Sequence, residues 1–260
     1  MELNAKRTVA IVGTRNNSNY GKKITEELVA RLKDIDDLLI VSGLAFGIDA
    51  IAHNASLSHQ IPTVGVLGHG LGSIYPYQHK NMAEKMMENG GILSELFHDV
   101  APDRYNFPKR NRIVAGMTDV TIVIETGKKG GSVITANLAN DYNRDVFAVP
   151  GRTMDAHSEG CNWLIAQKRA ELYFSPEEFV DFMDWGEKTK TKKASQRSLF
   201  QDFDENESIL VKILEEKEGI SIDELVEMSK MSQGRIASVL LNLELKGIVE
   251  SLPGKRYMLS

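Results

Sequence analysis

The stretch Leu38-Leu39-Ile40-Val41-Ser42-Gly43-Leu44-Ala45-Phe46-Gly47-Ile48-Asp49-Ala50-Ile51-Ala52-His53 contains the unit from which most of this chain is built. Residues 38–41 are continuously apolar, as expected for a strand that is buried on both faces. Two glycines follow, and apolar residues then recur at the i, i+3, i+4, i+7 spacing of a helix with one buried face. These residues are Ile48, Ile51, Ala52 and Ala55. The stretch therefore predicts a strand, a turn and a helix in succession.

The same pattern recurs along most of the chain. Apolar runs predict further strands at 8–12, 63–67, 92–93, 120–124 and 146–149. Helical patterns lie between them at 20–33, 79–89, 108–117 and 131–142. Strands and helices that alternate in this way predict an α/β fold with a mostly parallel sheet covered by helices on both faces.

A change in composition separates this α/β domain, expected over residues 1–185, from a smaller domain over 205–260. Residues 186–204 are polar and rich in lysine, which predicts a flexible linker. The small domain has three helical patterns followed by two short strands around Pro253-Gly254. This order predicts a winged helix, a variant of the helix-turn-helix.

Capping signals support the helices of the small domain. Ser221 and Glu224 have the spacing of a capping box at the start of the second helix. We expect Ser232 to begin the third helix and Gly247 to end it.

Charge and cysteine content restrict the class of protein. The 260 residues include 31 Lys and Arg against 36 Asp and Glu, a formal net charge of -5. Global acidity does not exclude nucleic acid, because binding depends on where the positive charges cluster. The single Cys161 excludes an internal disulfide and fits a reducing compartment. The sequence has no apolar signal region and no apolar run that could span a bilayer, so we expect a cytoplasmic protein without membrane contact.

Glycine-rich turns follow several of the predicted strands. They include Gly13-Thr14-Arg15, Ser42-Gly43 and Lys128-Lys129-Gly130-Gly131-Ser132. Ligands of open parallel sheets bind beyond the carboxyl ends of the strands, where these turns are expected to meet. Glycine lets backbone amides approach an anion closely, and a helix N-terminus attracts negative charge. The first turn lacks the second and third glycines of a dinucleotide fingerprint, and residues 127–129 lack the preceding glycine of a Walker motif, so no nucleotide cofactor is predicted.

A basic and aromatic segment lies at the start of the helix predicted at 108–117. Its residues are Arg104, Tyr105, Phe107, Lys109, Arg110 and Arg112. Arginine forks suit phosphate, and aromatic rings provide stacking platforms for unpaired bases. Alternatively, Phe107 belongs to the core and the arginines pair with Glu95, Asp103 or Asp119. On composition alone, these two interpretations are evenly balanced.

The sequence provides little support for catalysis. The histidines have no metal-ligand spacing among themselves, and Cys161 stands alone. Glu95 and Glu125 each follow a strand and could hold a metal or act as a base, although solvated carboxylates are the favoured interpretation. No nucleophile, base and orienting group are recognisable together. We therefore predict no catalytic residue and no metal ligand.

Several motifs, taken in order, resemble those of the DprA/Smf family, the DNA processing protein A of bacteria. They span residues 8–175 and include 9–15, 42–53, Tyr75-Pro76, 90–95, 107–116, 129–136, 149–151 and 158–165. The resemblance implies an extended Rossmann-like fold that binds single-stranded DNA, with the winged helix that many members carry. It also implies a homodimer, formed around residues 140–180, that protects incoming DNA and loads RecA recombinase during natural transformation. No nucleotide cofactor and no established reaction are implied.

The resemblance also assigns a DNA-binding groove. Its residues would be Gly13, Arg15, Ser42, Gly43, Phe107, Arg110, Asn111, Arg112, Lys128, Lys129, Gly131 and Ser132. The family often has one lysine followed by Ser-Gly-Ser, whereas this sequence has two lysines, so the lysine that contacts DNA stays open. Many members also have an N-terminal helical domain, for which the sequence shows no counterpart.

Two other functions compete with this one. A related-looking Rossmann family hydrolyses nucleotide monophosphates and has the signature Pro-Gly-Gly-x-Gly-Thr-x-x-Glu. Residues 127–137 match this signature only loosely, and Asn137 stands near the position of its catalytic glutamate. The winged helix could instead read duplex DNA with the outward face of its third helix. That face has few basic residues, and contact with another protein is the slightly favoured role.

Overall fold

The computed structural model describes residues 3–185, 203–216, 219–252 and 256–259. The chain divides into two compact units, residues 1–188 and 189–260. Each unit has a hydrophobic core of its own. The linker predicted over 186–204 lies almost entirely outside the described residues.

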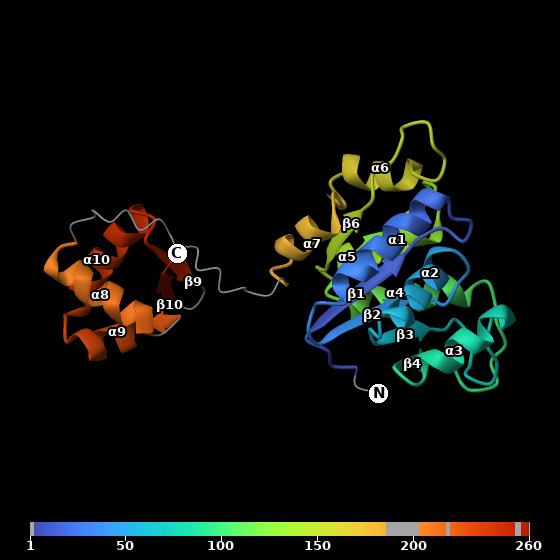
Figure 1. The fold of residues 1–260 in the computed structure, drawn as a ribbon, viewed down its shortest axis with the longest axis horizontal. Helices are drawn as coiled ribbons and strands as arrows, with labels where there is room; N and C mark the ends of the chain where they lie inside the picture. Colours follow the sequence, from blue (N-terminus) through green and yellow to red (C-terminus); the bar gives the residue numbers. More distant parts are fainter. Residues whose placement is uncertain (1–2, 186–202, 217–218, 253–255, 260) are drawn as a thin grey trace. The chain divides into compact units, whose positions relative to one another are not determined.

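The first unit is built on a seven-stranded sheet of order β4-β3-β2-β1-β5-β6-β7, in which every pairing is parallel (Figure 1). The strands are β1 (Arg7–Val12), β2 (Leu38–Ser42), β3 (Thr63–Val66), β4 (Gly90–Leu93), β5 (Val120–Val123), β6 (Asp145–Ala148) and β7 (Glu171–Leu172). The six predicted strands are confirmed to within two residues at each end, and β7 is an additional strand. The chain builds the sheet outward from β1 on one side and then crosses to β5 on the other, so the strand order reverses beside β1. In parallel sheets this switch point is the usual place for a ligand.

Helices cover both faces of the sheet, which confirms the predicted fold class. They are α1 (Asn19–Leu32), α2 (Ile48–Ser58), α3 (Lys80–Met86), α4 (Asn106–Met117), α5 (Gly131–Asp141), α6 (Glu159–Ala166) and α7 (Pro176–Phe182), with a short 3-10 helix, η1 (Tyr77–His79). One core joins α1, α2 and α7 to one face of the sheet, and a second joins α4, α5 and α6 to the other. Alternate residues of β1 divide between the two cores: Val9 and Ile11 belong to the first, and Ala10 and Val12 to the second.

The second unit is a winged helix, as predicted. Its elements are α8 (Glu205–Glu216), β8 (Ile220–Ser221), α9 (Ile222–Ser229), α10 (Gln233–Leu245), β9 (Val249–Leu252) and β10 (Arg256–Leu259). The capping box is present, because Glu224 N donates to Ser221 Oγ (3.2 Å) and Ser221 N donates to Glu224 Oε2 (3.0 Å). Ser232 precedes α10 as its N-cap, and Gly247 follows the helix with φ +68°, a left-handed conformation that favours glycine.

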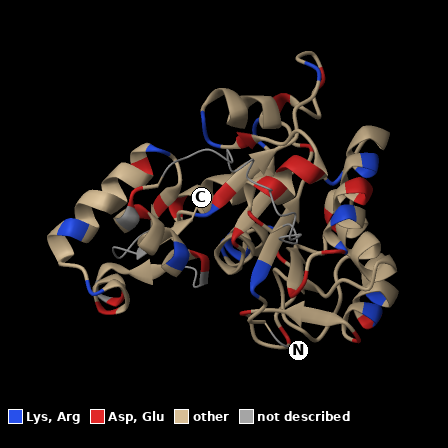
Figure 2. Ribbon diagram, turned by 60° about the vertical axis from the view of Figure 1, so that its left-hand side comes forward, with Lys and Arg blue, Asp and Glu red and all other residues tan. Residues whose placement is uncertain are grey.

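Charges of both signs are interspersed along the helices (Figure 2). Pairs at i, i+4 link Lys22 to Glu26 (3.8 Å) on α1 and Lys80 to Glu84 (3.9 Å) on α3. Exposed pairs of this kind contribute little to stability, about 0–1 kcal/mol each. Among the described residues, none of the helices is both long and apolar enough to cross a bilayer.

Candidate functional site

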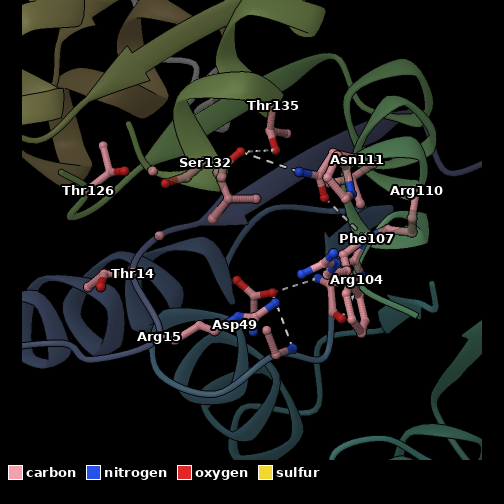
Figure 3. A pocket seen from close by; sticks show the side chains of 18 of the residues that line it. Thr14, Arg15, Asp49, Arg104, Phe107, Arg110, Asn111, Thr126, Ser132 and Thr135 are labelled. Atoms are coloured by element: carbon pink, nitrogen blue, oxygen red, sulfur yellow. Dashed lines mark hydrogen bonds between the residues drawn. The ribbon is translucent and has the colours of Figure 1, made fainter. Parts of the chain in front are cut away.

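A pocket of about 590 Å³ opens where β1, β2 and β5 end, at the switch point of the sheet (Figure 3). Five segments that are distant in sequence form its walls: the turn after β1, the turn after β2 with the start of α2, the segment at Tyr75, the start of α4 with the residues before it, and the start of α5 with the residues before it. Eight of the predicted site residues line the pocket, namely Gly13, Arg15, Gly43, Phe107, Arg110, Asn111, Gly131 and Ser132. The carboxyl-end turns therefore meet in space as their sequence positions predict.

Glu125 fixes the turn after β1. Its carboxylate accepts hydrogen bonds from the Ser18 backbone N–H (2.9 Å) and the Ser18 hydroxyl (2.5 Å), and its own carbonyl accepts one from Thr14 N–H (2.7 Å). Only 1% of Glu125 is exposed, so the interpretation of this residue as a solvated carboxylate is wrong. Its role is structural, because it anchors the segment that carries Arg15 into the pocket.

The N-terminus of α5 forms the opposite wall. Gly130 is its N-cap, and no side chain caps this end of the helix. A Cβ at Gly131 would meet no atom within 4 Å, so open space lies in front of the first turn. The helix dipole and the first backbone N–H groups make such an end attractive to an anion. Asn111 Nδ2 donates to Gly131 O (3.3 Å), which ties α4 to this first turn.

Arg110 is an interior group. It is 6% exposed, and its guanidinium donates to the backbone carbonyls of Gly43 (2.5 Å) and Val66. Burial lowers the pKa of Arg110, and the nearby Asp49 acts in the opposite direction. A Cβ at residue 43 would lie 2.6 Å from Arg110 Cζ, so glycine is required there for the close approach.

Asp49 is the counter-charge of Arg110. It is 7% exposed, and its carboxylate accepts hydrogen bonds from the backbone N–H groups of Gly43 (3.1 Å) and Ala45 (3.3 Å). Burial raises the pKa of this carboxyl, while Arg110 and these hydrogen bonds act to lower it. Asp49 and Arg110 together hold the turn after β2 against α4.

The other predicted site residues lie outside the pocket lining. Ser42 is completely buried, and its hydroxyl donates to the Ile11 carbonyl (2.6 Å). Arg112 forms an exposed ion pair with Glu95, as the structural interpretation of this segment anticipated. Lys128 and Lys129 are both exposed, just before α5.

An aromatic wall completes the pocket. The Arg15 guanidinium lies over the Phe107 ring, with Cζ 5.4 Å from its centroid, and the Tyr75 ring lies 5.9 Å from Phe107. Tyr75, Asp49 and Arg104 line the pocket but are absent from the predicted site. Arg104 had a signal in the basic and aromatic cluster, whereas Tyr75 lies in a turn 29 residues before Arg104, with no local charge to mark it.

The lining has the chemistry of a binding site. Among the described residues it contains three arginines and one carboxylate, the Asp49 that is already bound to backbone amides. The described part of the chain contains no cluster of His, Cys, Asp and Glu that could hold a metal ion. Asn137 lies outside the pocket lining and accepts a hydrogen bond from Arg169 (2.8 Å).

Comparison with known proteins covers both units. The family model of DNA recombination-mediator protein A matches residues 1–184, and that of the DprA winged helix domain matches residues 192–255. Protein Smf of Synechocystis is 34% identical over 277 aligned positions, which cover 96% of this chain and 69% of the relative. DNA processing protein DprA of Streptococcus pneumoniae is 41% identical over 172 positions, covering 66% of this chain and 60% of the relative.

A solved structure of DNA processing protein A from Helicobacter pylori superposes with a TM-score of 0.65 at 33% identity. It covers 70% of this chain and 83% of that one, and its subject is the single-stranded DNA binding mode of that protein. This chain spans about two thirds of the length of the curated relatives that it matches.

Proposed function

Because this chain belongs to the DNA recombination-mediator protein A (DprA/Smf) family, we propose that its α/β unit binds single-stranded DNA in the pocket at the ends of β1, β2 and β5. One observation carries the proposal. Arg15, an uncapped helix N-terminus and aromatic rings line the same pocket, and the one carboxylate among the described lining residues, Asp49, already accepts hydrogen bonds from backbone amides. The phosphate and the base of a nucleotide each have a matching surface there.

The phosphate would lie between Arg15 and the first turn of α5. Arg15 projects from the turn that Glu125 anchors, and the amides of Gly131 and Ser132 begin the facing helix. An arginine fork and a helix N-terminus are both suited to a phosphate oxygen. Lys128 and Lys129 are exposed just before this helix start and would attract the phosphate backbone to that wall of the pocket.

Arg110, in contrast, acts through the shape of the pocket. Its donors are directed at the Gly43 and Val66 carbonyls, so it holds the turn after β2 in place and adds positive potential from beneath the surface. A variant of Arg110 would therefore lose the pocket itself, and cannot isolate a contact with DNA.

We further propose the cellular role that family membership favours. In that role the chain protects single-stranded DNA, loads RecA recombinase onto it during natural transformation and acts in the cytoplasm as a homodimer. The mechanism is binding without a catalysed step, since the pocket lining has no free general base. In the winged helix, Leu241 (56%) and Leu245 (79%) are exposed on α10, and Lys246 pairs with Glu207 (2.6 Å). This favours a contact with a protein over the reading of duplex DNA.

The proposal is tested by measuring oligothymidine affinity with fluorescence anisotropy over a series of salt concentrations. We expect Arg15→Ala to weaken binding about 10- to 150-fold, the value of one or two hydrogen bonds to a charged group. Lys33→Ala is the matched control, because Lys33 is exposed after α1 and lines a depression at the amino ends of the strands, the opposite edge of the sheet. Equal affinities of the wild type, the Arg15 variant and the control would refute the assignment of the pocket.

A further inference from the structure

Phe107 was the aromatic residue expected to stack on DNA, but three neighbours already surround its ring. Arg15 lies over it, with Cζ 5.4 Å from the centroid, and Tyr75 lies at 5.9 Å with the two ring planes inclined by 33°. A Cβ at Gly68 would lie 2.8 Å from Phe107 Cδ1, so the chain at residue 68 packs directly against the ring. Phe107 is half-buried and has little open surface to offer a base.

Tyr75 has the open surface that Phe107 lacks. It lines the same pocket, and 47% of the residue is exposed. It is supported from behind by the Phe107 ring and by the buried His69 ring, whose centroid lies 6.4 Å away in an edge-to-face arrangement of 88°. A ring that is packed on two sides and open on the remainder is already ordered, so little conformational freedom is lost when a ligand stacks on it.

We propose that Tyr75 is the platform on which a base of the bound strand stacks, next to the nucleotide whose phosphate lies between Arg15 and α5. This inference rests on the proposed binding of single-stranded DNA and assigns a residue to its base-contacting part. Stacking on an aromatic face tolerates every base, because each has a π-face, so Tyr75 would add affinity without sequence preference. Arg15 would then contact the phosphate while it orders the aromatic wall through Phe107.

The chain offers well-matched variants for a test. Tyr75→Ala removes the ring, Tyr75→Phe keeps it, and Tyr75→Leu keeps an apolar contact with Phe107 but removes the aromatic face. Tyr77→Ala is the control, because Tyr77 is two residues away, 73% exposed and outside the pocket lining. Each variant is titrated with an oligothymidine and with a strand of the same length whose sugars carry no bases.

We expect Tyr75→Ala and Tyr75→Leu to weaken binding of the oligothymidine about 5- to 140-fold, which corresponds to the loss of one stacked base. Their affinity for the abasic strand stays within about twofold of wild type, since its phosphates are unchanged. Tyr75→Phe and Tyr77→Ala bind both strands like the wild type. In addition, the fluorescence of Tyr75→Trp is quenched by the oligothymidine and unchanged by the abasic strand.

The inference is overturned if Tyr75→Ala and Tyr75→Leu lose the same affinity for the oligothymidine and the abasic strand, or lose affinity for neither, while the wild type binds. The proposed function itself fails in a different way, through a wild-type protein that binds neither strand. The two failures are distinguished in the same titration.

Discussion

Replacement of Arg110 by alanine is predicted to destabilise the α/β unit strongly, although the neighbouring Arg112 can be replaced at little cost. Arg110 is 6% exposed and donates to the Gly43 and Val66 carbonyls, and its charge favours the ionised form of the buried Asp49. Its removal leaves the two carbonyls without a donor and takes away this positive charge. Each buried acceptor left unsatisfied costs about 1–3 kcal/mol, so the two together cost about 2–6 kcal/mol. For a domain of this size, that corresponds to a fall in Tm of about 4–24 °C.

The measurement is urea unfolding followed by circular dichroism, with Arg112→Ala as the matched control. Arg112 is exposed in its pair with Glu95, so its replacement is expected to cost about 0–1 kcal/mol. In the double variant Arg110→Met, Asp49→Asn, the cost should be smaller than the sum of the two single variants, because no unpaired charge remains. An Arg110→Ala protein as stable as Arg112→Ala would refute the reasoning.

The pH dependence of the Arg110→Ala variant provides a second check. Burial already raises the pKa of Asp49, and the variant loses the guanidinium that opposes this effect. A carboxyl whose folded pKa lies above its unfolded value favours folding at low pH, and that contribution is lost as the pH rises through the folded pKa. The deficit of the variant relative to wild type should therefore be larger at pH 7 than near pH 4. A deficit that is the same at both pH values would contradict the assignment of Asp49 as the unpaired group.

Three further predictions concern a buried histidine, a tightly packed glycine and two exposed lysines. Burial lowers the pKa of His53 from 6.5 to about 3, so the free energy of unfolding of the wild type should fall by up to about 1.4 kcal/mol per pH unit as the pH drops from 6.5 toward 3. His53→Leu should remove this slope in urea titrations, and an unchanged slope would count against the assignment to His53. A Cβ at Gly130 would overlap the Thr126 hydroxyl, whereas one at Gly131 would meet open space. Gly130→Ala should therefore be about 1–3 kcal/mol less stable than Gly131→Ala, and equal stabilities would contradict this geometry. Lys128→Ala or Lys129→Ala should reduce the slope of log DNA affinity against log salt concentration by about 0.7. If neither variant changes this slope, the bound DNA does not pass along the start of α5.

Hydrophobic periodicity was sufficient to predict the α/β sheet and most of its helices. Five of the six predicted strands are buried at every residue or at all but the first, and burial on both faces of the sheet is the physical cause of their apolar runs. In the edge strand β4 only Gly91 is buried. The strand β7 has only two residues, both exposed, so no apolar run marks it. The capping box at Ser221 was equally predictable, because its contacts are local.

The site was less predictable because its contacts join distant residues. Arg110 and Arg112 are two positions apart in one basic cluster, yet one is buried and the other is exposed. What distinguishes them is the position of Val66 and Gly43, which lie 44 and 67 residues from Arg110. Tyr75 enters the pocket from another distant turn. The sequence could therefore place the glycine turns at one edge of the sheet, but could not tell which side chains line the pocket.

The most direct test of the account is a crystal structure of this chain with a short oligothymidine. The account predicts a phosphate within hydrogen-bond distance of Arg15 and of the first amides of α5, with a base stacked on Tyr75 and Arg110 still bound to the Gly43 carbonyl. A strand that lies elsewhere on the protein, with the pocket at the ends of β1, β2 and β5 free of DNA, would contradict it.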